Sequence, residues 1–345
     1  MSIPYRTKRA FKGFFTGLLA LSVFAVLVLV CWLLWLNRYV IYSADGAKID
    51  FDLPVRFAQG ETAGAPEPAG TVPIYGMTTE EEPEAISREL TRFSGYYVTL
   101  KELTGDIGAV IAKLEALPEG STVMLELKSV NGYTYYSSTV AATNPKFDTT
   151  QVDALIQKLI DGGYYVIAQI PAFQEYYYIM ENERERVAYG LPKTGGSSLW
   201  LDGDYRCYWL NPASDGTMTY LIQLLTELRS LGIHEVVFSD FRFPSTTKVS
   251  FDGNKTDTLN AAAATLVKTC ATDKFCVSFT RSAVDLELPG GRTRLYLTDI
   301  AAADAAETAA KTSFADPTIQ LVFLTELSDT RYDEYCVLRP LDSAH

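Results

Sequence analysis

Short apolar runs recur at intervals from residue 93 onward, and most of them end in polar residues. The runs are rich in β-branched and aromatic residues, as is typical of strands buried on both faces of a parallel sheet. Eight strands are predicted, over residues 95–100, 122–127, 164–170, 235–240, 275–280, 294–299, 319–324 and 335–340.

Helical periodicity separates most of these strands. Apolar residues three and four positions apart predict amphipathic helices, over residues 106–117, 151–161, 217–232, 258–270 and 301–312. The connections after the fifth and seventh strands are shorter and leave room for one helical turn or none. The alternation predicts an α/β fold, a (β/α)8 barrel of the TIM type over residues 93–345. A doubly wound open sheet has the same periodicity and is the alternative.

A longer apolar run precedes the barrel, because residues 14–36 carry no charge. As a helix this run spans about 35 Å, which covers a hydrocarbon core of roughly 30 Å. Basic residues lie mainly before the run, within residues 6–12, and only Arg38 follows closely. This bias predicts a single-pass transmembrane helix with a cytoplasmic tail, residues 1–13, and an extracellular remainder. A cleaved secretory signal is the alternative, but its apolar run is usually ~7 to 15 residues.

Residues 37–92 are predicted to form an extracellular linker. Residues 58–84 are rich in Gly, Pro, Ala, Thr and Glu and have little to bury, which is typical of an extended spacer. Just before them, residues 39–55 form two short runs around an Asp-Gly turn, the pattern of a small hairpin.

Composition narrows the chemistry. The chain has a net charge of −12, and its basic residues are enriched in residues 1–38, so the rest is more acidic still and suits nucleic acid poorly. Only His234 and His345 are present, which argues against Ser-His, Cys-His and His-metal sites. The cysteines follow no metal or disulfide spacing, although Cys270 and Cys276 are close enough to pair. No metal or cofactor is expected.

The strand tips carry the candidate chemistry, because the active sites of (β/α)8 barrels lie at the C-terminal ends of the strands. Paired carboxylates about 5 to 9.5 Å apart cleave glycosidic bonds, one protonating the leaving oxygen while the other attacks or activates water. The candidate catalytic residues are Asp240, Glu326 and Glu126. The residues expected to bind substrate are Lys128, Gln169, Glu175, Trp209, Asn211, Ser239, Arg242 and Asp299.

A structural interpretation of the same residues stays open. Glu126 with Lys128, or Asp240 with Arg242, are typical of ion pairs that stabilise a barrel without catalysing. Tyrosine-rich loops over residues 133–138, 174–180 and 205–212 suit stacking on sugar rings, but tyrosines also pack beneath long loops.

The ordered motifs GYYVTL, LELKSVNGYTYYS, YYVIAQIPAF, YWLNPAS and LRSLGIHEVVFSDFRFP resemble a glycosyl hydrolase-like barrel domain of bacterial membrane-anchored envelope proteins. The resemblance covers roughly residues 93–283. It implies a (β/α)8 barrel related to the α-amylase-like glycosidases, with carbohydrate as the ligand class.

The motifs depart from that family in several places. The family's Asp-x-Lys on the second strand is Glu126 and Lys128 here, and the Arg that ends its third strand is Gln169. A Phe-Lys-Asp segment becomes Phe-Gln-Glu, ending at Glu175, and a Trp-x-Asp-Pro motif keeps Trp209 but has Asn211 in place of the acid.

The fourth strand departs as well, because the family's acid falls on Ser239 while Arg242, Phe243 and Pro244 are kept. Asp240 follows at once, but successive strand residues point to opposite faces, so it replaces the acid only if the backbone re-aims it.

These observations predict a glycoside hydrolase-like barrel anchored in the cell membrane that recognises a cell-envelope or extracellular carbohydrate, such as a peptidoglycan-type glycan. Hydrolysis would use paired carboxylates. The alternative is a catalytically inactive barrel that binds glycan or acts as an envelope scaffold.

Overall fold

The computed structural model describes residues 40–43, 46–49, 90–181 and 183–344, and the chain divides into two units, Met1–Gly76 and Met77–His345. In the first unit, β1 (Val40–Ser43) and β2 (Gly46–Ile49) pair antiparallel, in the segment where the sequence predicts a hairpin. The predicted membrane span at residues 14–36 lies outside the described residues. Within the described part of the chain, no helix has the length and hydrophobicity needed to cross a bilayer.

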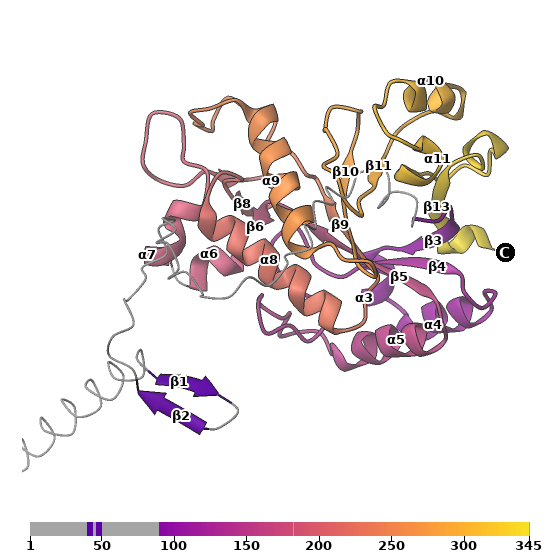
Figure 1. Ribbon diagram of the computed structural model, residues 1–345, viewed down its shortest axis with the longest axis horizontal. Helices are drawn as coiled ribbons and strands as arrows, with labels where there is room; N and C mark the ends of the chain where they lie inside the picture. Colours follow the sequence, from indigo (N-terminus) through magenta and orange to yellow (C-terminus); the bar gives the residue numbers. More distant parts are fainter. Residues whose placement is uncertain (1–39, 44–45, 50–89, 182, 345) are drawn as a thin grey trace, which may run out of the picture. The chain divides into compact units, whose positions relative to one another are not determined.

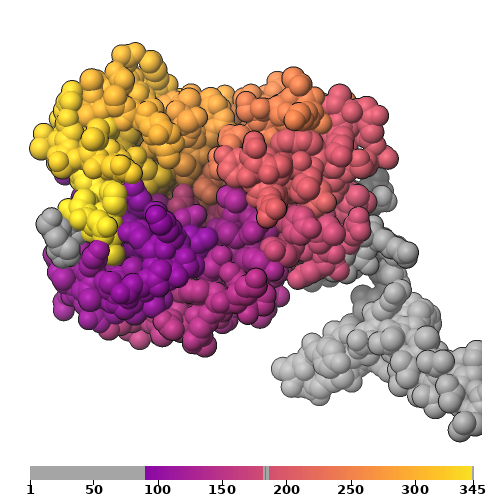
Figure 2. Space-filling view, turned by 180° about the vertical axis from the view of Figure 1, so that it is seen from behind, coloured from indigo at the N-terminus to yellow at the C-terminus, as the bar shows by residue number. Residues whose placement is uncertain are grey.

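Eight parallel strands of the second unit close into a barrel (Figure 1). In order around the barrel they are β3 (Ser94–Val98), β4 (Thr122–Glu126), β5 (Tyr165–Pro171), β9 (Glu235–Ser239), β10 (Cys276–Arg281), β11 (Leu295–Leu297), β12 (Leu321–Leu324) and β13 (Cys336–Pro340). The last strand, β13, pairs with the first, β3. Figure 2 shows this closure as the contact between the yellow C-terminal residues and the purple residues that begin the barrel. All eight predicted strands are present, and closure rules out the open sheet.

Helices cover the outside of the barrel. They are α3 (Leu100–Thr104), α4 (Ile107–Glu115), α5 (Thr150–Asp161), α8 (Asp215–Ser230), α9 (Lys255–Cys270), α10 (Ala305–Ala310) and α11 (Pro317–Gln320), with short 3-10 turns η3 (Ala302–Asp304) and η5 (Leu341–Ala344). The connection after β10 holds no helix and the one after β12 holds only η4 (Thr330–Tyr332), as predicted. Side-chain caps set two helix starts, Asp106 for α4 and Asn254 for α9.

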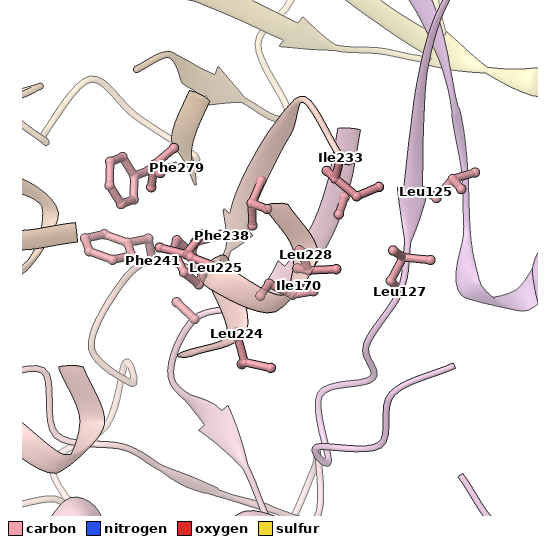
Figure 3. Packing of buried hydrophobic residues seen from close by; sticks show 14 of the residues in the cluster. Leu125, Leu127, Ile170, Leu224, Leu225, Leu228, Ile233, Phe238, Phe241 and Phe279 are labelled. Atoms are coloured by element: carbon pink, nitrogen blue, oxygen red, sulfur yellow. The ribbon is translucent and has the colours of Figure 1, made fainter. Parts of the chain in front are cut away.

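The main core lies between the strands and these helices. Leu225 of α8 is buried with Phe238 of β9, and Phe241 packs against Phe279 of β10 with ring centroids 4.5 Å apart (Figure 3). Burial of such apolar surface is the principal driving force of folding. It holds β9 and β10, and with them the tips of these strands, in fixed positions.

A second, smaller core fills the barrel interior. It contains Met124, Ile167, Val237, Tyr296 and Leu338, one from each of five strands. Because strand side chains alternate between faces, the residues two positions farther along β4, β5 and β9 also point inward. These are Glu126, Gln169 and Ser239, which brings three of the predicted site residues to the barrel mouth.

A buried ion pair closes the N-terminal end of the barrel. Arg294 contacts Glu235 at 2.5 Å, and both side chains are almost fully buried. The carboxylate also accepts hydrogen bonds from Tyr165 (3.0 Å), Ser278 (2.6 Å) and Tyr296 (2.8 Å). Burial and then the charge of Glu235 raise the pKa of Tyr296 well above its usual value. We call Glu235, Arg294 and these three hydroxyl groups the barrel plug.

The segment between β5 and α8 holds structure that the sequence pattern missed. Its strands β6 (Gln174–Glu175), β7 (Leu201–Asp202) and β8 (Cys207–Trp209) form an antiparallel sheet, beside α6 (Tyr177–Glu181), α7 (Glu183–Arg186) and η2 (Val187–Tyr189). Strands this short give no readable alternation. The four described cysteines are free and buried, so Cys270 and Cys276 do not pair. Burial raises the pKa of Cys207 and Cys276 to about 12 and keeps both as neutral thiols.

Candidate functional site

A cleft of about 660 Å³ opens at the C-terminal ends of the barrel strands. Its wall is built by residues at the tips of β3, β4, β5, β11 and β12. The polar side chains that line it are Tyr97, Thr99, Gln169, Thr298, Asp299, Thr325 and Glu326. The volume lies within the usual range for small-molecule sites, roughly 300–1,000 Å³.

Glu126 neighbours this cleft but is not among the residues that line it. It ends β4, where it is paired in register with the cleft residue Gln169 on β5. One of its carboxylate oxygens accepts a hydrogen bond from the backbone N–H of Leu100, at 2.7 Å. Burial raises the pKa of Glu126 above its usual value, and the Leu100 hydrogen bond offsets part of that rise. The carboxyl group therefore keeps its proton to a higher pH than an exposed glutamate does, which is the direction that a general acid requires.

Two more carboxylates line the cleft from the opposite strands. Asp299 follows β11 and Glu326 follows β12, and both side chains are exposed to solvent. Among the described residues no Lys or Arg forms an ion pair with either of them or with Glu126. The pKa of Tyr97 is raised by burial and next by the charge of Glu326, which places the carboxylate of Glu326 near the hydroxyl group of Tyr97.

Asp240 takes a different course at the tip of β9. Its backbone has a φ of 49°, in the left-handed region, so the side chain leaves the alternation of the strand. Its carboxylate accepts a hydrogen bond from Nε of Arg242 at 3.1 Å, in an ion pair whose side chains are 41% and 36% exposed. Asp299 has a similar φ of 61°. Strained backbone of this kind concentrates at functional sites, yet only Asp299 faces the cleft without a cationic partner in the described chain.

Neutral polar side chains also reach the mouth of the barrel. Ser239 and Gln169 point into the mouth by the alternation of their strands, and Thr280 does so at the tip of β10. The hydroxyl group of Thr280 is buried and has no hydrogen-bond partner within the described structure. Buried polar groups usually have a partner, so this hydroxyl is available to a ligand that enters the mouth.

Lys128 and Glu175 lie outside the cleft and pair with each other. Their charged atoms are 2.6 Å apart and each side chain is only 1% exposed. Tyr220 donates a hydrogen bond to the same carboxylate at 2.8 Å. Gly132, with a φ of 103°, passes so close that a Cβ there would lie 1.7 Å from Oε1 of Glu175. The alternative ion pair of Glu126 with Lys128 does not form, because Lys128 turns away to this buried site.

Trp209 and Asn211 also have structural partners. The indole N–H of Trp209 donates to Asp202 at 3.1 Å, the ring is 1% exposed, and the guanidinium of Arg242 lies over it at 5.2 Å. The side chain of Asn211 accepts a hydrogen bond from the backbone of Ala213, in a turn before α8. The structure thus links Arg242 to the small antiparallel sheet.

The cleft therefore gathers Gln169, Asp299 and Glu326, while Glu126 and Ser239 end the strands on either side of Gln169 without lining the cleft. It does not gather Lys128, Glu175, Trp209 or Asn211. Sequence reasoning missed the lining residues Tyr97, Thr99, Thr298 and Thr325. A signal was present for the three threonines, because each lies near the end of a predicted strand or just after it, but uncharged residues at tips do not stand out from ordinary strand ends.

Comparison with known proteins shows which family the chain belongs to. Residues 95–280, more than half of the chain, match a family described as "Putative glycosyl hydrolase domain". The chain belongs to this family. The matched part of the glycosyl hydrolase domain includes Glu126, Gln169 and Ser239, and it ends before Asp299 and Glu326. Among curated proteins, none matches the sequence.

Solved structures share the fold. An α-galactosidase from Geobacillus stearothermophilus in complex with stachyose is 10% identical over 74% of this chain and 40% of its own, with a TM-score of 0.50. The complex of that enzyme with 1-deoxygalactonojirimycin is 11% identical over 75% and 40%, also with a TM-score of 0.50. A hypothetical protein from Ruminiclostridium thermocellum is 20% identical over 53% of this chain and 96% of its own, with a TM-score of 0.44. The chain thus spans 40% of the length of the α-galactosidase, and the likeness is one of fold.

Proposed function

We propose that the barrel mouth binds a carbohydrate and hydrolyses a glycosidic bond, with Glu126 as the general acid and Glu326 as the second carboxylate. One observation carries the proposal: Glu126, a half-buried carboxyl group with a raised pKa, is paired in register with the cleft residue Gln169, and the cleft itself is lined by two exposed carboxylates that no Lys or Arg of the described chain neutralises. Paired carboxyl groups in unlike environments are the requirement of glycosidases.

The two groups have distinct tasks in this scheme. The proton of Glu126 passes to the glycosidic oxygen as its bond to the anomeric carbon breaks, and the leaving sugar departs as an alcohol. Glu326, exposed to solvent, is the carboxylate that attacks the anomeric carbon or takes a proton from the attacking water. Asp299, on the neighbouring strand, is the alternative for this second task. Gln169, Ser239 and Thr280 supply uncharged hydrogen-bonding groups for sugar hydroxyls.

We also propose that this reaction takes place outside the cell membrane, on a cell-envelope or extracellular glycan. The support is the uncharged run of residues 14–36 and the basic residues that precede it. Fractionation of cells that express the full chain, followed by protease treatment of intact cells, tests this. We expect the full chain to be found in the membrane fraction. We expect protease added to intact cells to digest the barrel.

The test of hydrolysis is the release of reducing ends from purified peptidoglycan and from soluble oligosaccharides. The variant Glu126→Gln removes the proton but keeps the hydrogen bond from Leu100, and we expect turnover to fall about 10²- to 10⁴-fold. The matched control is Glu119→Gln, which makes the same replacement at an exposed residue before β4, near the opposite end of the barrel. Equal losses in the two variants would refute the role of Glu126.

A second function is favoured by the tip of β9, where Ser239 replaces the expected acid and Asp240 pairs with Arg242. In this alternative the barrel binds glycan without turnover. The wild-type protein would then bind oligosaccharide saturably and release no reducing ends, and Glu126→Gln would bind as the wild type does.

A further inference from the structure

A second hollow of about 440 Å³ adjoins the cleft on its β3 side. The two hollows share three lining residues, Tyr97, Thr99 and Glu326. The second hollow then runs over α3, α4 and the end of β13, where its walls include Lys101 and Asp342. Glu326, the second carboxylate of the proposed reaction, therefore stands at the junction of two connected spaces.

Several charged groups of the second hollow are held by hydrogen bonds or ion pairs. Glu102 forms a capping box with Thr99, and Asp106 caps α4. The ammonium group of Lys113 forms an ion pair with the carboxylate of Asp342. These groups are held in place, and the carboxylates of the lining outnumber its ammonium groups, which suits a neutral, hydroxyl-rich ligand better than an anionic one. Lys101 is exposed and forms no ion pair within the described residues, so its ammonium group is free to donate hydrogen bonds.

We propose that the two hollows form one groove for a glycan chain, with the reacting sugar in the larger hollow and the following sugars in the smaller one. This inference rests on the proposed function. Each hollow falls within the volume range of a complete ligand site, so one sugar ring does not fill both. The bond to be cleaved lies beside Glu326, where the hollows meet. The preferred ligand is thus an oligosaccharide or polymer rather than a single sugar.

The test measures how affinity depends on chain length. Glu126→Gln protein, which is expected not to cleave its ligand, is titrated calorimetrically with β-1,4-linked oligomers of N-acetylglucosamine and of glucose, from one sugar to six. We expect affinity for at least one series to rise about tenfold or more between one and four sugars, equivalent to about 1.4 kcal/mol. If neither series binds more tightly as it lengthens, the inference is overturned.

A second variant tests whether the rise in affinity with chain length comes from the smaller hollow. Lys101→Ala in the same background removes the free donor of the smaller hollow, and we expect it to weaken tetrasaccharide binding about five- to tenfold. Binding of the single sugar should change less than about twofold. The matched control is Lys274→Ala, an exposed lysine between α9 and β10 at the other end of the barrel. A gain with length that Lys101→Ala does not reduce would place the additional sugars elsewhere and overturn the assignment.

Assays on the wild-type protein separate this inference from the proposed function. Tighter binding of longer chains without any release of reducing ends would uphold the groove and refute hydrolysis. Release of the aryl group from single-sugar aryl glycosides, with no preference for longer chains, would uphold hydrolysis and refute the groove.

Discussion

The carboxylates at the two ends of the barrel differ in whether they have a cationic partner. At the N-terminal end, the Glu235 carboxylate meets Arg294 and accepts hydrogen bonds from three hydroxyl groups, all away from solvent. At the C-terminal end, Glu126, Asp299 and Glu326 have no cationic partner among the described residues. A charge removed from water must be matched by the protein, whereas charges that stay near water need no partner. The unmatched end is therefore the one free to bind a ligand.

The largest expected effect comes from breaking the barrel plug. Arg294→Met leaves Glu235 buried without its counter-charge, so we expect the free energy of unfolding to fall by about 3–5 kcal/mol. Urea denaturation of the barrel protein measures this. The double variant Glu235→Gln with Arg294→Met removes both charges and should recover part of the loss. A double variant as unstable as Arg294→Met alone would show that packing, rather than charge, dominates at this end.

A smaller effect of opposite sign is expected at the mouth. The pKa of Glu126 is raised in the folded protein, so the folded state favours the protonated form. Its contribution to stability is full below the unfolded pKa and is lost as the pH rises through the folded pKa. The variant Glu126→Gln stays neutral, and we expect it to be more stable than the wild type at about pH 7, by up to about 1 kcal/mol.

The measurement is the difference in Tm between Glu126→Gln and the wild type as the pH changes. The difference should shrink as the pH falls toward about 4, where the wild-type carboxyl group is also protonated. A difference that grows toward low pH would contradict the raised pKa. It would also remove the reason to choose Glu126 as the acid.

The smallest expected effect belongs to the half-exposed pair of Asp240 and Arg242. Exposed ion pairs contribute about 0–1 kcal/mol, so Asp240→Asn should lower the free energy of unfolding by less than about 1 kcal/mol. Hydrolysis should fall far less than in Glu126→Gln. A loss of turnover as large as that of Glu126→Gln, measured by reducing-end release, would instead assign catalysis to Asp240.

The sequence predicted the barrel well because each strand is a continuous apolar run. The sequence also predicted that the site lies at the C-terminal tips of the strands, and three of its candidate residues, Gln169, Asp299 and Glu326, line the cleft there. The barrel plug was not predictable in this way, because Glu235 and Arg294 are 59 positions apart and meet only when the barrel closes. The ion pair of Lys128 with Glu175 was not predictable for the same reason, since it depends on the path of a long loop.

The backbone conformation at the strand tips was the second feature that the sequence could not predict. The pattern of alternation cannot report that Asp240 adopts a φ of 49° and turns toward Arg242. Arg242 in turn lies over the ring of Trp209, which comes from a distant part of the sequence. Which tip carboxylates face the cleft therefore becomes clear only with the tertiary structure, because the loops that engage them come from distant parts of the chain.

The barrel plug also contacts the segment through which the chain enters β3. Besides Glu235, Arg294 donates a hydrogen bond to the backbone carbonyl of Thr91 at 3.0 Å and lies over the ring of Phe93 at 4.9 Å. Thr91 and Phe93 are where the chain enters β3. Tension that reaches residue 91 along the chain is therefore resisted first by the closed end of the barrel. The cleft lies at the other end of the same strands, away from this point of entry.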